Sequence, residues 1–188
     1  MVLHRIRHLI WYLVNRRQYG YLSPRAYLQK NIRIDGKTGI ELHKNSCVQR
    51  GSWIASVPVT GKKKSLLKIG EDCVLGNYNH IYASSSIIFE KEVLTADRVY
   101  ISDCAHCYED VSKSIIRQPI KQLNEIIIGE GAWLGENVCI IGASVGKHSI
   151  VGANSVVTKD IPDFSVAVGS PAKVVKRYDF ILKEWVKC

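Results

Sequence analysis

The feature that most constrains this chain is a six-residue repeat over residues 128–162, IGEGAWLGENVCIIGASVGKHSIVGANSVVTKDIP. Each segment begins with an aliphatic residue, which glycine usually follows, and one segment has five residues. These aliphatic positions are Ile128, Leu134, Ile140, Val145, Val151 and Val157. Neither an amphipathic helix nor an alternating strand has that spacing, whereas a parallel β-helix does, with one short strand and one turn per segment.

The same spacing occurs earlier in the chain. Further aliphatic positions are Leu42, Val48, Ile54, Ile69, Leu75, Ile81, Ile87, Val93 and Val99. Residues 58–65 interrupt them with glycine and three lysines and are expected to form a loop. From Ile69 to Val99 we expect an unbroken frame, with a local distortion near residues 89–92 because Lys91 takes a small inward position. An all-β solenoid is therefore predicted over residues 35–171.

The closing segments resemble a known family. Residues 151–162 (VGANSVVTKDIP) and 168–177 (VGSPAKVVKR) are similar to the ending of the hexapeptide-repeat acyltransferases, in particular the sugar O-acetyltransferases of capsular polysaccharide and lipopolysaccharide. The resemblance implies a left-handed parallel β-helix, although parallel β connections are otherwise nearly always right-handed. It also implies acetyl-CoA as donor and a homotrimer with active sites between subunits.

A long interruption of the repeat follows Val99. Its start, Ile101-Ser102-Asp103-x-x-His106, resembles the place where sugar O-acetyltransferases of the family carry their catalytic histidine, so residues 104–126 are expected to be a catalytic loop. A neutral imidazole suits proton transfer at pH 7, which makes His106 the expected general base. Asp103 either holds the imidazole tautomer or is a turn carboxylate at the end of a strand.

The resemblance also assigns donor and acceptor contacts. Ala153, through its backbone, together with Thr158 and Lys159 would line the pantetheine and phosphate path of acetyl-CoA. The far phosphates would meet Lys173 and Lys176. Asn79 matches a position that binds the acceptor in small-sugar members of the family; its alternative role is an inward hydrogen-bonded ladder.

The N-terminal region is strongly basic. Residues 1–34 hold seven Lys or Arg and no Asp or Glu, and their first half predicts an amphipathic helix before a transition. Residues 1–17 either contact an anionic membrane surface or cover the open end of the solenoid. With no apolar stretch near the ~20 residues of a membrane span, we expect a cytoplasmic protein, at the inner membrane face if the helix binds lipid.

Residues 172–188 are expected to form a tail with a short helix. Asp179 is the predicted N-cap, and Phe180, Ile181 and Trp185 would pack back on the coils.

Cys104 and Cys107 form a lone C-x-x-C pair. A zinc site would usually need a second such pair or a paired histidine motif, so no metal is expected and free thiols are the default. The basic residues come without a nucleic-acid-binding motif, so no nucleic-acid partner is expected.

These features predict an enzyme that moves an acetyl group from acetyl-CoA to a sugar hydroxyl, on a polysaccharide, a lipid-linked sugar or a nucleotide sugar. Three alternatives stay open: N-acetylation of an amino sugar, a non-catalytic β-helix scaffold, and a metal-dependent hydratase of the carbonic anhydrase kind. The last would need three histidines at a subunit interface, and only His80 and His106 lie at suitable places.

Overall fold

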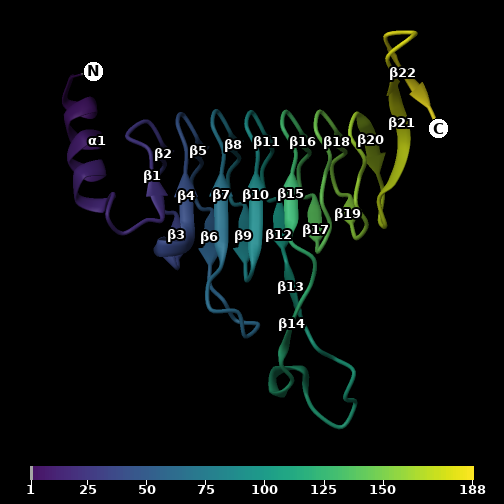
Figure 1. The fold of residues 1–188 in the computed structure, drawn as a ribbon, viewed down its shortest axis with the longest axis horizontal. Helices are drawn as coiled ribbons and strands as arrows, with labels where there is room; N and C mark the ends of the chain where they lie inside the picture. The colour runs from purple at the N-terminus through teal and green to yellow at the C-terminus, as the bar shows by residue number, and fades with distance from the viewer. Residues whose placement is uncertain (1) are drawn as a thin grey trace.

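A computed structural model describes residues 2–188, with side chains from Leu9 onward. The chain passes in rotation through three parallel sheets, A, B and C, so that each coil stacks on the one before it (Figure 1). Sheet A contains β1 (Tyr21–Leu22), β4 (Ile40–Leu42), β7 (Leu66–Ile69), β10 (Ser86–Phe89) and β15 (Ile126–Ile128). Sheet C contains β3 (Arg33–Asp35), β6 (Trp53–Ser56), β9 (His80–Ala83), β12 (Tyr100–Ser102), β17 (Cys139–Ile141) and β19 (Val156–Val157).

Sheet B is the longest of the three. Its parallel strands are β2 (Tyr27–Leu28), β5 (Cys47–Val48), β8 (Val74–Leu75), β11 (Leu94–Thr95), β16 (Trp133–Leu134), β18 (Ile150–Val151) and β20 (Ser165–Val168). The aliphatic residues of the repeat lie inside the coils, where they form one continuous apolar core. Ile81 and Ile101, for example, are register partners on neighbouring strands and are fully buried. Their burial explains why one aliphatic residue recurs in every segment.

The coils begin earlier than residue 35. Strands β1, β2 and β3 form a first coil, because β1 pairs with β4, β2 with β5 and β3 with β6. The stretch from Pro24 to Asp35, which the sequence suggested was a transition, is therefore part of the solenoid. A 3₁₀ helix, η1 (Lys37–Gly39), joins this coil to the next.

The predicted unbroken frame from Ile69 to Val99 is wrong. Phe89, not Ile87, is the partner of Ile69, so the frame slips by two residues at the corner after β9. Strand β10 keeps its register with both neighbouring strands through Phe89, and Lys91 is exposed in the following turn. The expected distortion near residues 89–92 is thus replaced by a longer corner at residues 84–85.

Two insertions leave the coils at this same corner between sheets C and A. One is the loop at residues 57–65; the other is an arm at residues 103–125, and both project from the same side (Figure 1). The arm contains an antiparallel pair, β13 (Cys104–His106) and β14 (Ile120–Gln122), with the 3₁₀ helix η2 (Ile115–Arg117) near its tip.

The predicted C-terminal helix is wrong. Residues after Ala172 form a hairpin, β21 (Lys173–Asp179) and β22 (Glu184–Lys187), which extends sheet B from the open edge of β20. The Asp179 carboxylate does accept two backbone N–H groups, from Ile181 and Leu182 at 2.8 and 2.9 Å, but it does so in the hairpin turn. The available strand edge and the valines of this segment favour pairing over a helix.

The predicted N-terminal helix is present as α1 (Val2–Asn15). Trp11 and Tyr12 pack against the core, whereas Leu9, Ile10, Leu13 and Val14 are exposed. The side chains of residues 2–8, which belong to the predicted apolar and basic faces, lie outside the described residues. A cavity of about 710 Å³ separates α1 from the first coil, so the helix covers this end incompletely. Within residues 2–188, no helix is long and apolar enough to cross a membrane.

Candidate active site

His106 ends strand β13 at the base of the arm, where it pairs with Ile120. Its side chain is exposed and borders a cavity of about 280 Å³ between the outer face of sheet C and the arm. Aromatic residues from β6, β9 and β12 form the opposite side of this cavity. The expected general base therefore stands beside a space that a small ligand can enter.

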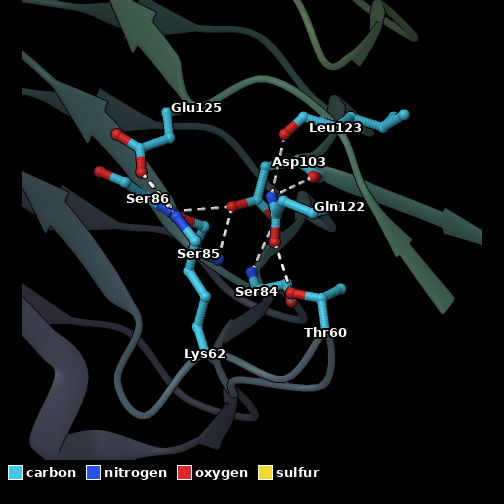
Figure 2. A network of polar contacts seen from close by, with 9 residues as sticks. All are labelled: Thr60, Lys62, Ser84, Ser85, Ser86, Asp103, Gln122, Leu123 and Glu125. Atoms are coloured by element: carbon cyan, nitrogen blue, oxygen red, sulfur yellow. Dashed lines mark hydrogen bonds and ion pairs between the residues drawn. The ribbon is translucent and has the colours of Figure 1, made fainter.

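Asp103 precedes this strand and is fully buried. Its two carboxylate oxygens accept the backbone N–H groups of Ser84, Ser85 and Ser86 at 2.7, 2.7 and 2.8 Å (Figure 2). Among the described residues, no hydrogen bond joins Asp103 to His106. The expected role of Asp103 as the group that orients the imidazole is therefore corrected, because its lone pairs serve the backbone of the preceding coil.

The longer corner at residues 84–85 explains why a carboxylate is needed there. The slip of the frame takes these N–H groups out of the regular ladder, and buried N–H groups need acceptors. A carboxylate satisfies all three with charge-assisted hydrogen bonds. Asp103 thereby fixes the first residue of the arm to the coil below it, which makes it a positioning residue for His106.

Other hydrogen bonds join the arm to the neighbouring loop. The Thr60 hydroxyl donates to the Gln122 side-chain oxygen at 2.6 Å, and the Gln122 amide donates to the Asp103 carbonyl at 2.6 Å (Figure 2). Lys62 forms an ion pair with Glu125 at 2.9 Å and also donates to the Ser85 hydroxyl. The bond from Lys62 is the largest of the effects that lower the pKa of Glu125. Lys62 thus contributes to a network around the arm.

Asn79 does not face the acceptor cavity. It is buried inside the coil, where its amide donates to the Thr95 hydroxyl and its oxygen accepts the Val99 backbone N–H at 2.8 Å. The expectation of acceptor binding is corrected in favour of the inward ladder.

The predicted donor residues are all exposed at the C-terminal end of the stack. Thr158 and Lys159 follow β19, and Ala172 donates its N–H to the Val156 carbonyl at 2.8 Å, which brings the start of β21 beside β19. In sheet C, β12 pairs with β17 and β17 with β19. Two strand spacings, roughly 10 Å, therefore separate the strand that leads into the arm from the strand that leads into Thr158.

Cys104 also borders the cavity and is half-buried. Burial is the main effect that raises the pKa of its thiol, so the thiol stays protonated at neutral pH and is a poor nucleophile. All six cysteines are free. No three His, Cys, Asp or Glu side chains of the described residues lie together in a way that could hold a metal ion.

Comparisons of the sequence with known proteins point to one family. The family model described as the hexapeptide repeat of succinyl-transferase matches residues 125–159. A Mycobacterium tuberculosis protein named as an acetyltransferase is 32% identical over 183 residues; the match covers 88% of this chain and 57% of that protein. An Escherichia coli protein named as a lipopolysaccharide biosynthesis O-acetyl transferase is 32% identical over 131 residues, covering 66% of this chain and 67% of its own length.

Solved structures share the fold. A maltose O-acetyltransferase from Clostridium difficile superposes with a TM-score of 0.61 at 24% identity, covering 94% of this chain and 85% of that one. The N-acyltransferase AntD from Bacillus cereus, in complex with dTDP and 3-hydroxybutyryl-CoA, superposes with a TM-score of 0.76 at 14% identity, covering 92% and 90%. At these identities the likeness establishes the architecture, and the chemistry has to be argued from the site itself.

Proposed function

This chain belongs to the hexapeptide-repeat acyltransferase family, and we propose that it transfers an acetyl group from acetyl-CoA to a hydroxyl group of a sugar. One observation carries the proposal. His106 borders a cavity on sheet C, and the exposed closing segment that the family uses for the donor follows two strands away in the same sheet. In this proposal the base and the acceptor space lie on sheet C, and the donor path begins two strands away, after β19.

We further propose that the coils wind left-handed and that the chain forms a homotrimer with the donor between subunits, as the family resemblance implies. Ala153, Thr158 and Lys159 would line the pantetheine and phosphate path. Lys173 and Lys176 on β21 would hold the far phosphates. All five of these residues are exposed in the single chain, so they are accessible to a ligand or to a second copy.

The proposed chemistry is a direct transfer. His106 takes the proton of the acceptor hydroxyl as its oxygen attacks the thioester carbonyl, and a backbone N–H group stabilises the negative oxygen that develops. The tetrahedral intermediate breaks its C–S bond, and the imidazolium returns the proton to the leaving sulfur. Asp103 takes no part in this proton transfer; it holds the first residue of the arm in place. The raised pKa of the Cys104 thiol disfavours an acyl-cysteine intermediate, because the thiolate is the nucleophilic form.

A hydroxyl acceptor is preferred to an amine because the Escherichia coli relative carries the name of an O-acetyl transferase. An amine would use the same base and donor, so N-acetylation is the second candidate, and AntD shows that an N-acyltransferase can have this architecture. The scaffold alternative is not favoured, since the curated relatives are named as acetyltransferases.

We also propose that α1 binds an anionic membrane surface, which would place the enzyme at the inner face of the membrane. The supporting observation is that Leu9, Ile10, Leu13 and Val14 point away from the core and are between 51% and 66% exposed. Arg16 and Arg17 follow them and are exposed as well. Exposed apolar side chains next to basic residues are typical of helices that lie in the interface between a membrane and water.

The experiment that tests the enzymatic proposal is acetyl-CoA turnover, measured by thiol release, with neutral glycosides, amino sugars, nucleotide sugars and lipid-linked sugars as acceptors. We expect release with a hydroxyl acceptor and formation of an O-acetyl ester. Release only with amino sugars would support N-acetylation. Absence of both turnover and acetyl-CoA binding would contradict the proposal.

A further inference from the structure

Three aromatic rings form a stack along the outer face of sheet C, beside His106. Trp53, His80 and Tyr100 are register partners on β6, β9 and β12. The Trp53 and His80 rings lie face to face with centroids 4.1 Å apart, and the His80 and Tyr100 rings meet edge to face at 5.2 Å. Because successive coils repeat the same position, the rings follow the axis of the solenoid and end directly at the arm.

The far end of the stack is held rigidly. The Arg33 guanidinium lies over the Trp53 ring at 4.0 Å, and the Trp53 N–H donates to the Asp35 carboxylate at 2.8 Å. Arg33 and Asp35 also form an ion pair at 2.9 Å. The faces of Trp53 are thus occupied by Arg33 and His80, so Trp53 serves as a fixed support and presents its edge to the cavity.

Tyr82 completes this wall. It lies two residues after His80 on β9 and meets Trp53 edge to face, with centroids 5.9 Å apart. Among the side chains described, from Leu9 onward, none forms a hydrogen bond with the hydroxyl group of Tyr82 or Tyr100, although both residues border the cavity with His106. Burial is the main effect that raises the pKa of Tyr82, so its phenol keeps the proton and can donate.

Among the described residues, no Asp, Glu, Lys or Arg lines the cavity; apart from its aromatic residues and histidines, its lining is small or aliphatic. Burial and the nearby Arg33 lower the pKa of His80, and its Nε2 atom is shut off from solvent without a hydrogen-bond partner in the described part of the chain. A mostly aromatic wall with two free hydroxyl groups and no Lys or Arg suits a neutral polyol better than a phosphate group, which favours positively charged partners.

The size points the same way. A volume of about 280 Å³ lies just below the usual range for ligand pockets, roughly 300–1,000 Å³. One sugar ring is small enough for such a space, whereas a nucleotide with its base and phosphates is not. The C–H groups of a pyranose pack on aromatic rings while its hydroxyl groups seek hydrogen bonds.

We propose that this aromatic pocket binds the acceptor as a neutral pyranose ring, with the hydroxyl groups of Tyr82 and Tyr100 as its hydrogen-bonding partners and the Trp53–His80 stack as its rigid support. The inference rests on the proposed acetyl transfer and adds to it the class of acceptor and the residues that select it. A sugar held there presents its hydroxyl group to His106, which borders the same space.

The test measures steady-state acetyl transfer to neutral methyl glycosides by thiol release, for wild type, Tyr82→Phe and Tyr100→Phe. Each variant keeps its ring and loses its hydroxyl, so we expect kcat/KM for the glycoside to fall about 10-fold. The affinity for acetyl-CoA, measured by calorimetry, should not change. Tyr78→Phe is the matched control, because Tyr78 is exposed on a turn outside the cavity and should leave both quantities unchanged.

The possible results separate the two proposals. If wild type acetylates a glycoside and both Phe variants keep its kcat/KM, the acceptor pocket is wrong while the proposed function stands. If the variants weaken acetyl-CoA binding instead, the cavity receives the pantetheine arm and the inference is overturned. If wild type binds no acetyl-CoA and transfers to no sugar, the proposed function fails and the inference fails with it.

Discussion

The Asp103 carboxylate accepts the backbone N–H of Ser85 at 2.7 Å, across the corner that separates two successive coils. The same carboxylate binds the N–H groups on either side of Ser85. This contact lies where the hexad frame slips and where the arm leaves the coils. One buried side chain therefore supports both an irregular corner and the strand that carries His106.

Asp103→Asn should destabilise the protein by about 3 kcal/mol. An amide offers one acceptor oxygen in place of two and turns its NH₂ group toward backbone donors. Urea unfolding at fixed protein concentration measures the change, since oligomer stability depends on concentration. Glu184→Gln, at an exposed position of β22, is the control and should change the free energy of unfolding by less than about 0.5 kcal/mol. Equal effects of the two substitutions would contradict the account of this corner.

His80 should make folding depend on pH. Burial, and then the charge of Arg33, lowers the pKa of His80 from the ordinary histidine value of 6.5, so between the folded and unfolded pKa values the unfolded chain binds more protons. The contribution of neutral His80 to the free energy of unfolding is therefore fully present above pH 6.5 and decreases as the pH falls toward 5.

The measurement for His80 is the midpoint of urea unfolding between pH 5 and 7.5, for wild type and for His80→Phe. The informative quantity is the difference between the two proteins, because the variant lacks only the His80 imidazole. We expect a flatter pH dependence in the variant, which keeps a flat ring in the stack. An unchanged or steeper dependence would show that His80 titrates normally in the folded protein.

Membrane binding should depend both on the apolar side chains of α1 and on Arg16 and Arg17, which follow the helix. Sedimentation with anionic phosphatidylglycerol vesicles is expected to retain wild type, and Arg16→Gln with Arg17→Gln should weaken binding about 30-fold, from ~1 kcal/mol per basic residue near the surface. Leu9→Ser with Leu13→Ser should also weaken it. Ile181→Ser removes an apolar side chain that is 93% exposed on the C-terminal hairpin and serves as the control. Equal binding to neutral phosphatidylcholine vesicles would contradict the electrostatic part of the proposal.

The stacked coils could be predicted because most segments carry an aliphatic residue at the inward position, where its surface is buried. Ile128, Leu134 and Ile140 reveal the repeat directly, and each is fully buried. The slip after β9 was not predictable in this way, because Ile87 and Phe89 are both apolar and either could continue the frame. The choice between them is made by pairing with β7, which is a long-range interaction.

The position of His106 followed from the motif around it, but its surroundings did not. Trp53, His80 and Tyr100 are separated by 27 and 20 residues and become neighbours only through the length of each coil. The link between Lys62 and Glu125 likewise joins two insertions that are distant in the sequence. The prediction for the C-terminal segment failed for a different reason. Asp179 does accept a backbone N–H group, as a helix N-cap would, but it does so in the turn of a hairpin.

The most direct test of the central claim is acetyl-CoA turnover by His106→Ala, compared with wild type on an acceptor that wild type acetylates. We expect the transfer rate to fall by about 100- to 10,000-fold, the usual contribution of a general base, while the affinity for acetyl-CoA stays the same. A variant that transfers acetyl groups at the wild-type rate would contradict the claim, because the base would then be a different residue.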